Sequence, residues 1–400
     1  MDKVIVVGCG VPGYGAIRAF ADKDIYLIAL THEGNFACVS RYSSETILIP
    51  LSDEYLLSLL IRNARQWEGA LVLETSDYMA TALSRNKDSL SRYYRIPTPD
   101  LKTLRLFTEK EKTYELAERC QVPYPKTIPL TKLDDLKEIS KFRYPCILKP
   151  ISSFEFVAKF GVKSFKVRNE IELIEKFKLC LSAGTPVLLQ EVIPGPDENF
   201  YRMEGYVNSQ GNLVGKFFCR KMRQHPPHFG VMRVGVSTEP DREVERLTRQ
   251  LLDPVHYRGY FSLEFKKDPR DGQLMLMENN CRLIRYNLLA TASGVNHPWI
   301  IYQDLVKNKQ IDVANYQVGK YWIELYPDLS YSLFQRNKED IRLRDYIAPY
   351  LGRHKVFAEL DFHDLKPFFK NTKRRVIDFF HKLLKALNIV KERMVLEKSS

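Results

Sequence analysis

The sequence predicts an α/β and α+β protein with two or three domains, and three observations support this fold class. The chain has 400 residues, more than a single hydrophobic core usually serves. Residues 4–30 read as a strand, a glycine-rich turn, a helix and a second strand, which is typical of a mononucleotide-binding α/β unit. Residues 259–283 contain two runs that alternate apolar and polar side chains around a turn, which predicts an antiparallel hairpin.

Composition limits the class of protein. Hydrophobic residues make up 44% of the chain, enough for packed globular domains. No run of about 18 apolar residues indicates a membrane-spanning helix, and the first residues lack the regions of a signal peptide. The seven cysteines are scattered without a Cys-x-x-Cys pair, which favours free thiols over a zinc site or disulfides. We therefore expect a cytoplasmic protein, with a peripheral membrane contact as the alternative.

The net charge of +12 is unevenly distributed. Residues 365–400 contain ten Lys or Arg against three acids, which leaves +7 in this tail. The remainder is only mildly basic, which argues against a nucleic-acid partner for the body of the protein.

The glycine-rich turn matches Gly-x-Gly-x-x-Gly at Gly8, Gly10 and Gly13. Glu33 lies 20 residues after Gly13, where a dinucleotide-binding fold places its ribose acid. The alternative is that the glycines only let a helix at residues 16–21 pack closely on the sheet. The residues alone do not separate these two interpretations.

A further strand is predicted at residues 71–77, and its polar end makes Asp77 a candidate substrate residue, with helix capping as the alternative. Pro97 and Pro99 mark the first domain boundary. Residues 108–119 read as a helix capped by Thr108.

Three later stretches carry candidate site residues. Lys149 closes the apolar strand 144–150 and is a phosphate candidate, with an exposed strand end as the alternative. A strand at 186–193 runs into a glycine-proline turn with acids. Beyond the predicted hairpin 201–219, Arg220 and Arg223 flank Lys221 and would hold phosphate or an acidic substrate, unless the segment is a solvated loop.

The hairpin at 259–283 places four polar residues together. Strand alternation puts Glu278, Asn280 and Arg282 on one face, and a turn about residue 271 places Glu264 opposite Glu278. Two carboxylates directly across a ladder repel unless a cation lies between them. Carboxylates with an amide suit Mg²⁺, so we favour a metal site over a polar sheet face in water.

Several motifs are absent. The sequence contains no P-loop, no His-Glu-x-x-His and no Gly-x-Ser-x-Gly. A Walker-type nucleotide site, a zincin site and a nucleophile elbow are therefore excluded.

Taken together, the motifs resemble the ATP-grasp superfamily, and more closely its carboxylate-amine ligases of the D-aspartate ligase-like kind. Lys110 stands 13 residues before Pro123, the spacing of the first phosphate lysine in that family, although Glu109 replaces the usual Asp. Lys149 in Ile-Leu-Lys-Pro matches the second lysine. Cys281 stands where Pro is common, and residues 151–161 replace the usual glycine-rich phosphate loop with a bulkier segment.

The resemblance implies ATP and Mg²⁺ as cofactors and assigns the site residues. It places adenine at Gln190, Glu191 and Ile193, and the ribose hydroxyls at Asp197. Its metal ligands are Glu264, Glu278 and Asn280, and its phosphate-steadying arginine is Arg282. It also implies an N-terminal Rossmann-like pre-ATP-grasp domain at residues 1–100 and an ATP-grasp domain at 101–320, with parts 101–192 and 193–320. Residues 321–400 form a C-terminal extension.

The implied activity is ATP-dependent amide or peptide bond formation between a small carboxylate and an amine through an acylphosphate, with release of ADP and phosphate. Two other functions remain open. A NAD(P)-dependent Rossmann-type oxidoreductase would use the glycine turn and Glu33, and a non-catalytic anion- or membrane-binding adaptor would use the basic tail. A homo-oligomer is compatible with the sequence.

The tail ends in a basic amphipathic pattern. Its apolar residues recur at helical spacing, at Val376, Phe380, Leu383, Leu384 and Leu387. Such a helix would lie on an anionic membrane surface or pack on its own chain. We favour packing, because apolar stripes of this period usually belong to a core.

Overall fold

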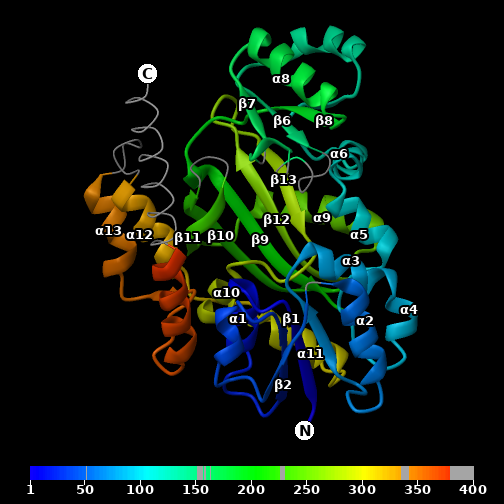
Figure 1. Cartoon of the computed structure of the whole chain (residues 1–400), viewed down its shortest axis with the longest axis vertical. Helices are drawn as coiled ribbons and strands as arrows, with labels where there is room; N and C mark the ends of the chain where they lie inside the picture. Colours follow the sequence, from blue (N-terminus) through cyan, green and yellow to red (C-terminus); the bar gives the residue numbers. More distant parts are fainter. Residues whose placement is uncertain are drawn as a thin grey trace, which may run out of the picture.

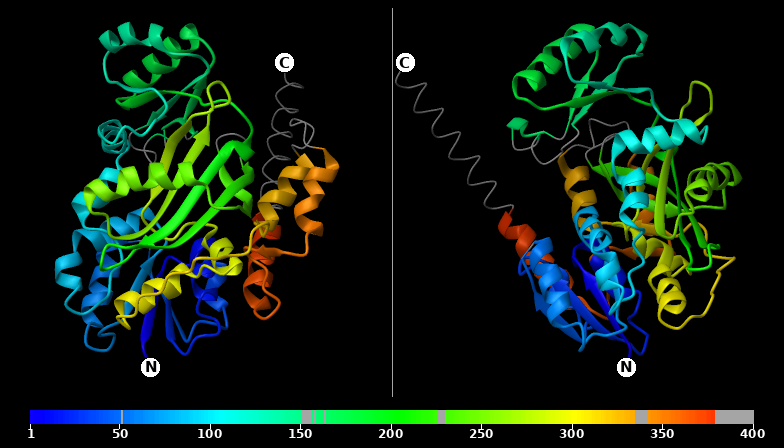
Figure 2. Two further views of the ribbon diagram at one scale, coloured as in Figure 1. Left: turned by 180° about the vertical axis from the view of Figure 1, so that it is seen from behind. Right: turned by 90° about the vertical axis from the view of Figure 1, so that its right-hand side faces the viewer.

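The structure is a computed structural model that describes residues 1–50, 52–150, 156, 159–162, 164–225, 230–334 and 342–378. Three sheets are stacked along its long axis (Figure 1). A four-stranded parallel sheet forms the N-terminal domain at one end, a seven-stranded sheet forms the body, and a four-stranded antiparallel sheet forms a lobe at the other end. Figure 2 shows the same order from two other sides.

The N-terminal sheet has the order β3-β2-β1-β4. Its strands are β1 (Lys3–Val7), β2 (Tyr26–Thr31), β3 (Glu45–Leu48) and β4 (Leu71–Glu74). The strand-turn-helix-strand prediction is confirmed, but helix α1 (Val11–Arg18) begins five residues earlier than predicted. Pro12 lies in its first turn, where proline suits a helix because no N–H is needed there. Helices α2 (Asp53–Arg62), α3 (Asp77–Arg85) and α4 (Lys87–Leu90) follow.

The seven-stranded sheet has the order β13-β12-β9-β10-β11-β14-β15. Its strands are β9 (Phe200–Val207), β10 (Leu213–His225), β11 (Val231–Ser237), β12 (Gly259–Lys267), β13 (Leu274–Asn280), β14 (Tyr321–Ile323) and β15 (Lys355–Phe357). Both predicted hairpins are confirmed. Arg220 and Arg223 are strand residues rather than loop residues, because β11 pairs with that part of β10.

The lobe sheet has the order β5-β8-β6-β7. Its strands are β5 (Thr127–Leu130), β6 (Cys146–Pro150), β7 (Phe165–Val167) and β8 (Val187–Glu191). Helix α8 (Glu170–Ser182) covers the lobe, which has its own hydrophobic core. Most of the segment 151–161, where the resemblance expects a glycine-rich loop, lies outside the described residues.

Two helices connect the N-terminal domain to the lobe, α5 (Leu101–Thr108) and α6 (Lys110–Arg119). The helix predicted at residues 108–119 is confirmed as α6, but its cap is not Thr108 as predicted. Thr108 closes α5, where its hydroxyl donates to the carbonyl of Leu104. Helix α6 begins at Lys110 with Glu109 as its N-cap.

The C-terminal extension is built into the body. Strands β14 and β15 widen the seven-stranded sheet, and helices α12 (Leu325–Phe334) and α13 (Leu343–Leu351) pack beside it. Residues 365–378 are helical, while Phe380, Leu383, Leu384 and Leu387 of the amphipathic pattern lie outside the described residues. None of the helices that the structure describes is both long and apolar enough to cross a membrane.

Candidate active site

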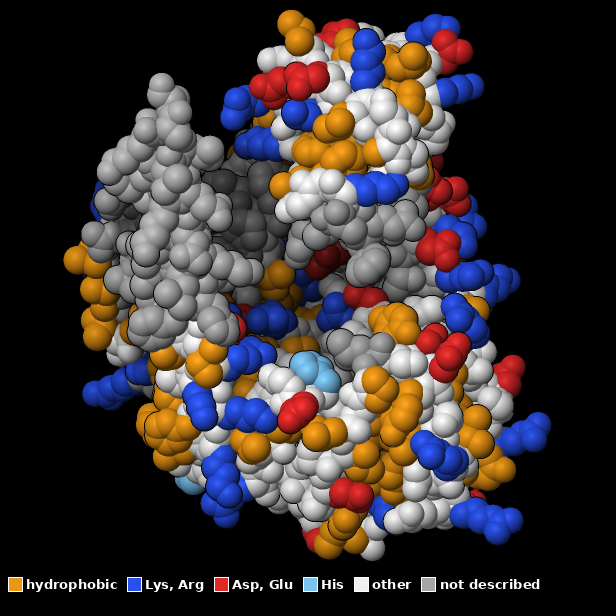
Figure 3. All heavy atoms as spheres, in the orientation of Figure 1, with side chains coloured by type: hydrophobic (Ala, Val, Ile, Leu, Met, Phe, Trp, Pro, Cys, Tyr) orange, Lys and Arg blue, Asp and Glu red, His pale blue; other side chains and the backbone are white. Residues whose placement is uncertain are grey.

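Three adjoining cavities meet at Lys149, at the end of β6, between the lobe and the seven-stranded sheet. We call them the β8 cavity, of about 260 Å³, the carboxylate cavity, of about 350 Å³, and the Asp77 cavity, of about 380 Å³. Figure 3 shows a hollow between the lobe and the body with acidic and basic side chains in it.

The β8 cavity has a largely apolar wall that includes Ile147, Phe200 and Met277. The predicted adenine residues Gln190, Glu191 and Ile193 all line it. Gln190 is buried, and its amide nitrogen donates to the hydroxyls of Tyr114 and Thr127 at 2.6 and 2.8 Å. A slot with apolar walls and a few fixed polar groups suits a flat heterocycle.

Two lysines stand at the junction of the cavities. The ammonium of Lys149 donates to Gln190 Oε1 at 2.5 Å. Burial and the nearby Lys110 lower the pKa of Lys149 to about 8, although Glu278 and Glu264 act in the opposite direction. Lys110 Nζ donates to the carbonyl of Pro150 at 3.0 Å, and its pKa is lowered by burial. The predicted phosphate lysines therefore face one space.

Glu264 and Glu278 pair directly across the β12–β13 ladder, as predicted. The register changes after this pair because Met277 is skipped as a bulge, so the turn is not centred on residue 271 as predicted. Arg202 on β9 lies between the carboxylates: Nη2 donates to Glu264 Oε2 and, at 3.2 Å, to Glu278 Oε1. The cation that two facing carboxylates require between them is thus the guanidinium of Arg202.

The two glutamates differ in environment. Glu264 is buried, and Lys221 Nζ lies 2.9 Å from its Oε2. Glu278 faces the open cleft, and its side chain is 55% exposed. Protein groups nevertheless lie close around its carboxylate. Burial raises the pKa of Glu278, but Arg202 and Lys221 outweigh it and bring this pKa to about 2. Glu278 is therefore charged near neutral pH.

The donor set fits a hard divalent cation that arrives with phosphates. The amide of Asn280 lies 3.2 Å from Glu278 Oε1, and within the described residues Oε2 of Glu278 has no hydrogen-bond partner. The described residues contain no group of three or more Asp, Glu, His or Cys side chains that would hold a metal ion by themselves. Mg²⁺ needs only one or two protein carboxylates when phosphates supply other ligands.

The structure joins two of the predicted site residues, Arg282 and Asp77, in an ion pair. Arg282 Nε and Nη2 donate to the two carboxylate oxygens of Asp77 at 3.0 and 3.1 Å. Asp77 lies in the first turn of α3, which Ser76 caps, and lines the Asp77 cavity with Lys110, Tyr114 and Asn280. Contact of Arg282 with a phosphate and of Asp77 with a substrate stay predictions.

Three other predicted residues do not line the cavities. The carboxylate of Asp197 accepts hydrogen bonds from Gln224. Arg220 donates to the carbonyl of Glu198, and Arg223 is buried in a bidentate pair with Asp328 of α12. Their contacts with ribose or substrate remain predictions, and the geometry gives Arg220 and Arg223 other partners.

Sequence reasoning missed Arg202 and passed over Lys221. Arg202 shares one face of β9 with Phe200 and Glu204. Strand β9 pairs with β12, which is not its neighbour in sequence order. The sequence of β9 alone does not indicate that β12 lies beside it. Lys221 was noted within a basic run, and a register shift beyond it in the pairing with β11 turns Lys221 and Gln224 to the cavity instead of Arg223.

The glycine-rich turn and the helix that follows it lie close to neighbouring backbone and side chains. A Cβ at Gly13 would lie 2.7 Å from the carbonyl oxygen of Gly8, and a Cβ at Gly15 would lie 2.4 Å from Asn287 Oδ1. Asn287 begins α10 (Asn287–Ser293) and donates to the carbonyl of Pro12 at 2.8 Å. These contacts give Gly13 and Gly15 a packing role, as the alternative to dinucleotide binding expects, whereas a Cβ at Gly10 would meet only the Pro12 ring at 3.6 Å.

Known proteins with similar sequence or structure point in one direction. No family model matches the sequence. The D-aspartate ligase of Enterococcus faecium (strain Aus0004) is 24% identical over 369 residues, which cover 85% of this chain and 86% of that protein. The N5-carboxyaminoimidazole synthetase of Staphylococcus aureus has a TM-score of 0.64 at 16% identity and covers 85% of this chain and 86% of its own.

The chain has the ATP-grasp fold. The L-amino acid ligase of Bacillus licheniformis is also similar, with a TM-score of 0.58 at 16% identity over 77% of this chain and 74% of its own. The fold predicted from the sequence is thereby confirmed. The S. aureus synthetase has also been crystallised with ADP, with a TM-score of 0.63. In the ATP-grasp fold of this chain, the three cavities lie between the lobe and the body.

Proposed function

We propose that this chain is an ATP- and Mg²⁺-dependent carboxylate-amine ligase that forms an amide or peptide bond and releases ADP and phosphate. The observation that carries this proposal is the charge of the carboxylate cavity. Among the described residues that line it, four are basic (Lys110, Lys149, Arg202 and Lys221) and two are acidic (Glu264 and Glu278). The resulting charge of +2 matches the −2 of MgATP.

The cavities divide the nucleotide between them. Adenine would lie against the apolar wall of the β8 cavity, and the phosphates would then extend past Lys149 and Lys110. Glu264, Glu278 and Asn280 would hold the metal, which supplies neutralisation of the phosphate oxygens when bound. Arg282 does not itself line the three cavities and is joined to the Asp77 cavity through its ion pair with Asp77.

The reaction needs positioning and charge neutralisation more than a protein nucleophile. A carboxylate oxygen of the acid attacks the γ-phosphorus, the bond to the bridging β,γ-oxygen breaks, and ADP leaves with that electron pair. Lys149 and Lys110 offset the charge that develops on the phosphate oxygens. The amine nitrogen then attacks the acyl carbon, the acyl C–O bond breaks, phosphate leaves, and the amine loses its proton.

The substrates are first sought among amino acids. Two similar proteins are a D-aspartate ligase and an L-amino acid ligase. The experiment is a screen of amino acids as acid and as amine, with ADP release measured in the presence of Mg²⁺. We expect release that requires both partners. Release that no acid or amine changes, together with tight NADH binding, would instead support an oxidoreductase.

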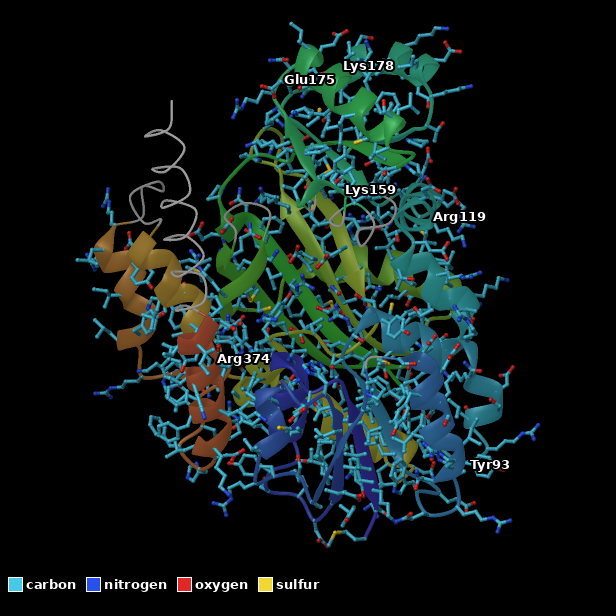
Figure 4. The ribbon with its side chains drawn as sticks, in the orientation of Figure 1. Tyr93, Arg119, Lys159, Glu175, Lys178 and Arg374 are labelled. Atoms are coloured by element: carbon cyan, nitrogen blue, oxygen red, sulfur yellow. The ribbon has the colours of Figure 1, made fainter. Side chains whose placement is uncertain are left out.

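We also propose that the C-terminal segment contacts an anionic membrane surface. The inner face of the helix at 365–378 packs on the N-terminal domain, since Lys370 donates to the carbonyl of Glu33 and Arg374 to that of Gly34. Figure 4 shows Arg374 on this helix beside that domain. The packing favoured from the sequence concerned the apolar stripe from Val376 to Leu387, and Val376, the one member of that stripe among the described residues, is exposed.

The outer face of this helix is apolar and basic. Phe369 and Val376 on the helix are 63% and 47% exposed, and Phe362 in the turn before it is 77% exposed. Lys366 and Lys373 are exposed between them. The +7 charge of residues 365–400 favours an anionic lipid surface over a second copy of the same segment, which would be repelled.

Replacing both Phe369 and Val376 by Ser is expected to lower binding to phosphatidylserine-containing vesicles about tenfold or more, because two buried side chains each contribute about 1.5–3 kcal/mol. Co-sedimentation measures the bound fraction. Ile171→Ser removes an equally apolar, 80% exposed side chain from α8 and serves as the matched control. Equal binding by the double variant and the unmodified chain rejects the membrane proposal.

A further inference from the structure

Arg202 occupies the centre of the candidate metal site. It lies on the middle of β9, and its side chain is only 3% exposed. Nη1 donates to Ser262 Oγ at 2.9 Å, and the guanidinium stands over the ring of Tyr286 at 5.1 Å. The group is therefore fixed from several sides while Nη2 bonds to both Glu264 and Glu278.

Lys221 reinforces this arrangement from β10. Its ammonium lies 3.0 and 2.9 Å from the two carboxylate oxygens of Glu264. Both oxygens of Glu264 and one oxygen of Glu278 are thus already bonded to cations of the chain. A divalent cation placed between the carboxylates would meet a guanidinium and an ammonium at close range, where like charges repel strongly.

We propose that Arg202 is a resident counter-ion that closes the two carboxylates to a bare divalent cation. The divalent cation then binds only together with a polyanionic ligand. Oxygens of that ligand accept the hydrogen bonds of the Arg202 guanidinium, which frees the two carboxylates to bind the metal. Cation and anion consequently bind with positive coupling, and the coupling is reciprocal. This inference rests on the proposed metal site but requires no turnover.

The test measures binding of Mn²⁺ to the full chain without any nucleotide, with free Mn²⁺ counted by electron paramagnetic resonance. Arg202→Met keeps the side-chain length and removes the charge, and we expect it to bind Mn²⁺ at least about tenfold more tightly than the unmodified chain. Arg202→Lys retains a cation and should behave like the unmodified chain.

Arg220→Met is the matched control. Arg220 is a partly buried arginine on the neighbouring strand β10, but its guanidinium bonds to the carbonyl of Glu198 and does not line the carboxylate cavity. Its Mn²⁺ affinity should be unchanged. The inference is overturned if the Arg202→Met variant binds Mn²⁺ no more tightly than the unmodified chain does.

A second measurement tests the inference without the Arg202→Met variant, in case that variant does not fold. The unmodified chain is titrated with Mn²⁺ with and without a non-hydrolysable ATP analogue, after correction for the metal–nucleotide complex in solution. We expect the protein's Mn²⁺ affinity to rise at least about tenfold with the analogue. Nucleotide binding without this rise overturns the inference alone, whereas no nucleotide binding at all contradicts the proposed function.

Discussion

Glu278→Gln is expected to lower ADP release by about a thousandfold, which corresponds to about 4 kcal/mol of transition-state stabilisation. The amide keeps the size of the side chain but loses the charge that a metal requires. The fold should persist, because Glu278 faces the cleft and Arg202 keeps Glu264 as its buried partner. A coupled assay for ADP with the acid and amine from the screen measures the effect.

The matched control is Glu175→Gln on helix α8. Its side chain is 70% exposed at the far end of the lobe, where Figure 4 labels it, so activity should remain unchanged. Thermal unfolding of both variants should be close to that of the unmodified chain. ADP release by Glu278→Gln at nearly the normal rate would refute the assignment of Glu278 to the metal.

Lys149→Met is expected to weaken ATP binding about a hundredfold, or about 2.7 kcal/mol. Lys149 lines all three cavities, and its ammonium is partly desolvated, so its attraction to phosphate is little screened. Methionine fills a similar volume without charge. Isothermal titration with a non-hydrolysable analogue measures the affinity, and Lys178→Met on the exposed side of α8 serves as control.

The same lysine predicts a pH dependence. Burial and Lys110 lower the pKa of Lys149 to about 8, from an ordinary value of 10.5, so the charged form is lost as the pH rises through about 8. In the free enzyme kcat/KM for ATP should therefore fall above this pH. Lys149→Arg should move the fall to higher pH, since arginine stays charged. A flat profile between about pH 7 and 9.5 would contradict the role of this charge.

Local patterns predicted the parts of the site that depend on strand alternation and short spacing. The pairing of Glu264 with Glu278 followed from a hairpin whose strands are adjacent in sequence. Lys110 was assigned through the resemblance to the ATP-grasp superfamily, which supplies the spacing to Pro123, and the start of its helix was misplaced by two residues. Neither result required knowledge of distant contacts.

The contacts that the sequence did not reveal join distant segments of the chain. Asp77 and Arg282 are 205 residues apart, so their ion pair has no signal in either local pattern. Arg223 was predicted as a substrate residue from the basic run around it, and nothing in that run indicated its buried partner, Asp328, on a helix far along the chain. Arg202 reaches the carboxylates only because β9 lies next to β12, an order that alternation along one strand does not encode.

The central claim is that the γ-phosphate of ATP is transferred to a carboxylate before the amide forms. The most direct measurement uses the acid from the screen, labelled with ¹⁸O in its carboxyl group, and mass spectrometry of the released phosphate. Our account predicts one ¹⁸O atom in the phosphate for each ADP formed, because the attacking carboxylate oxygen leaves with the phosphate. Phosphate without label, released at the same rate as ADP, would contradict it.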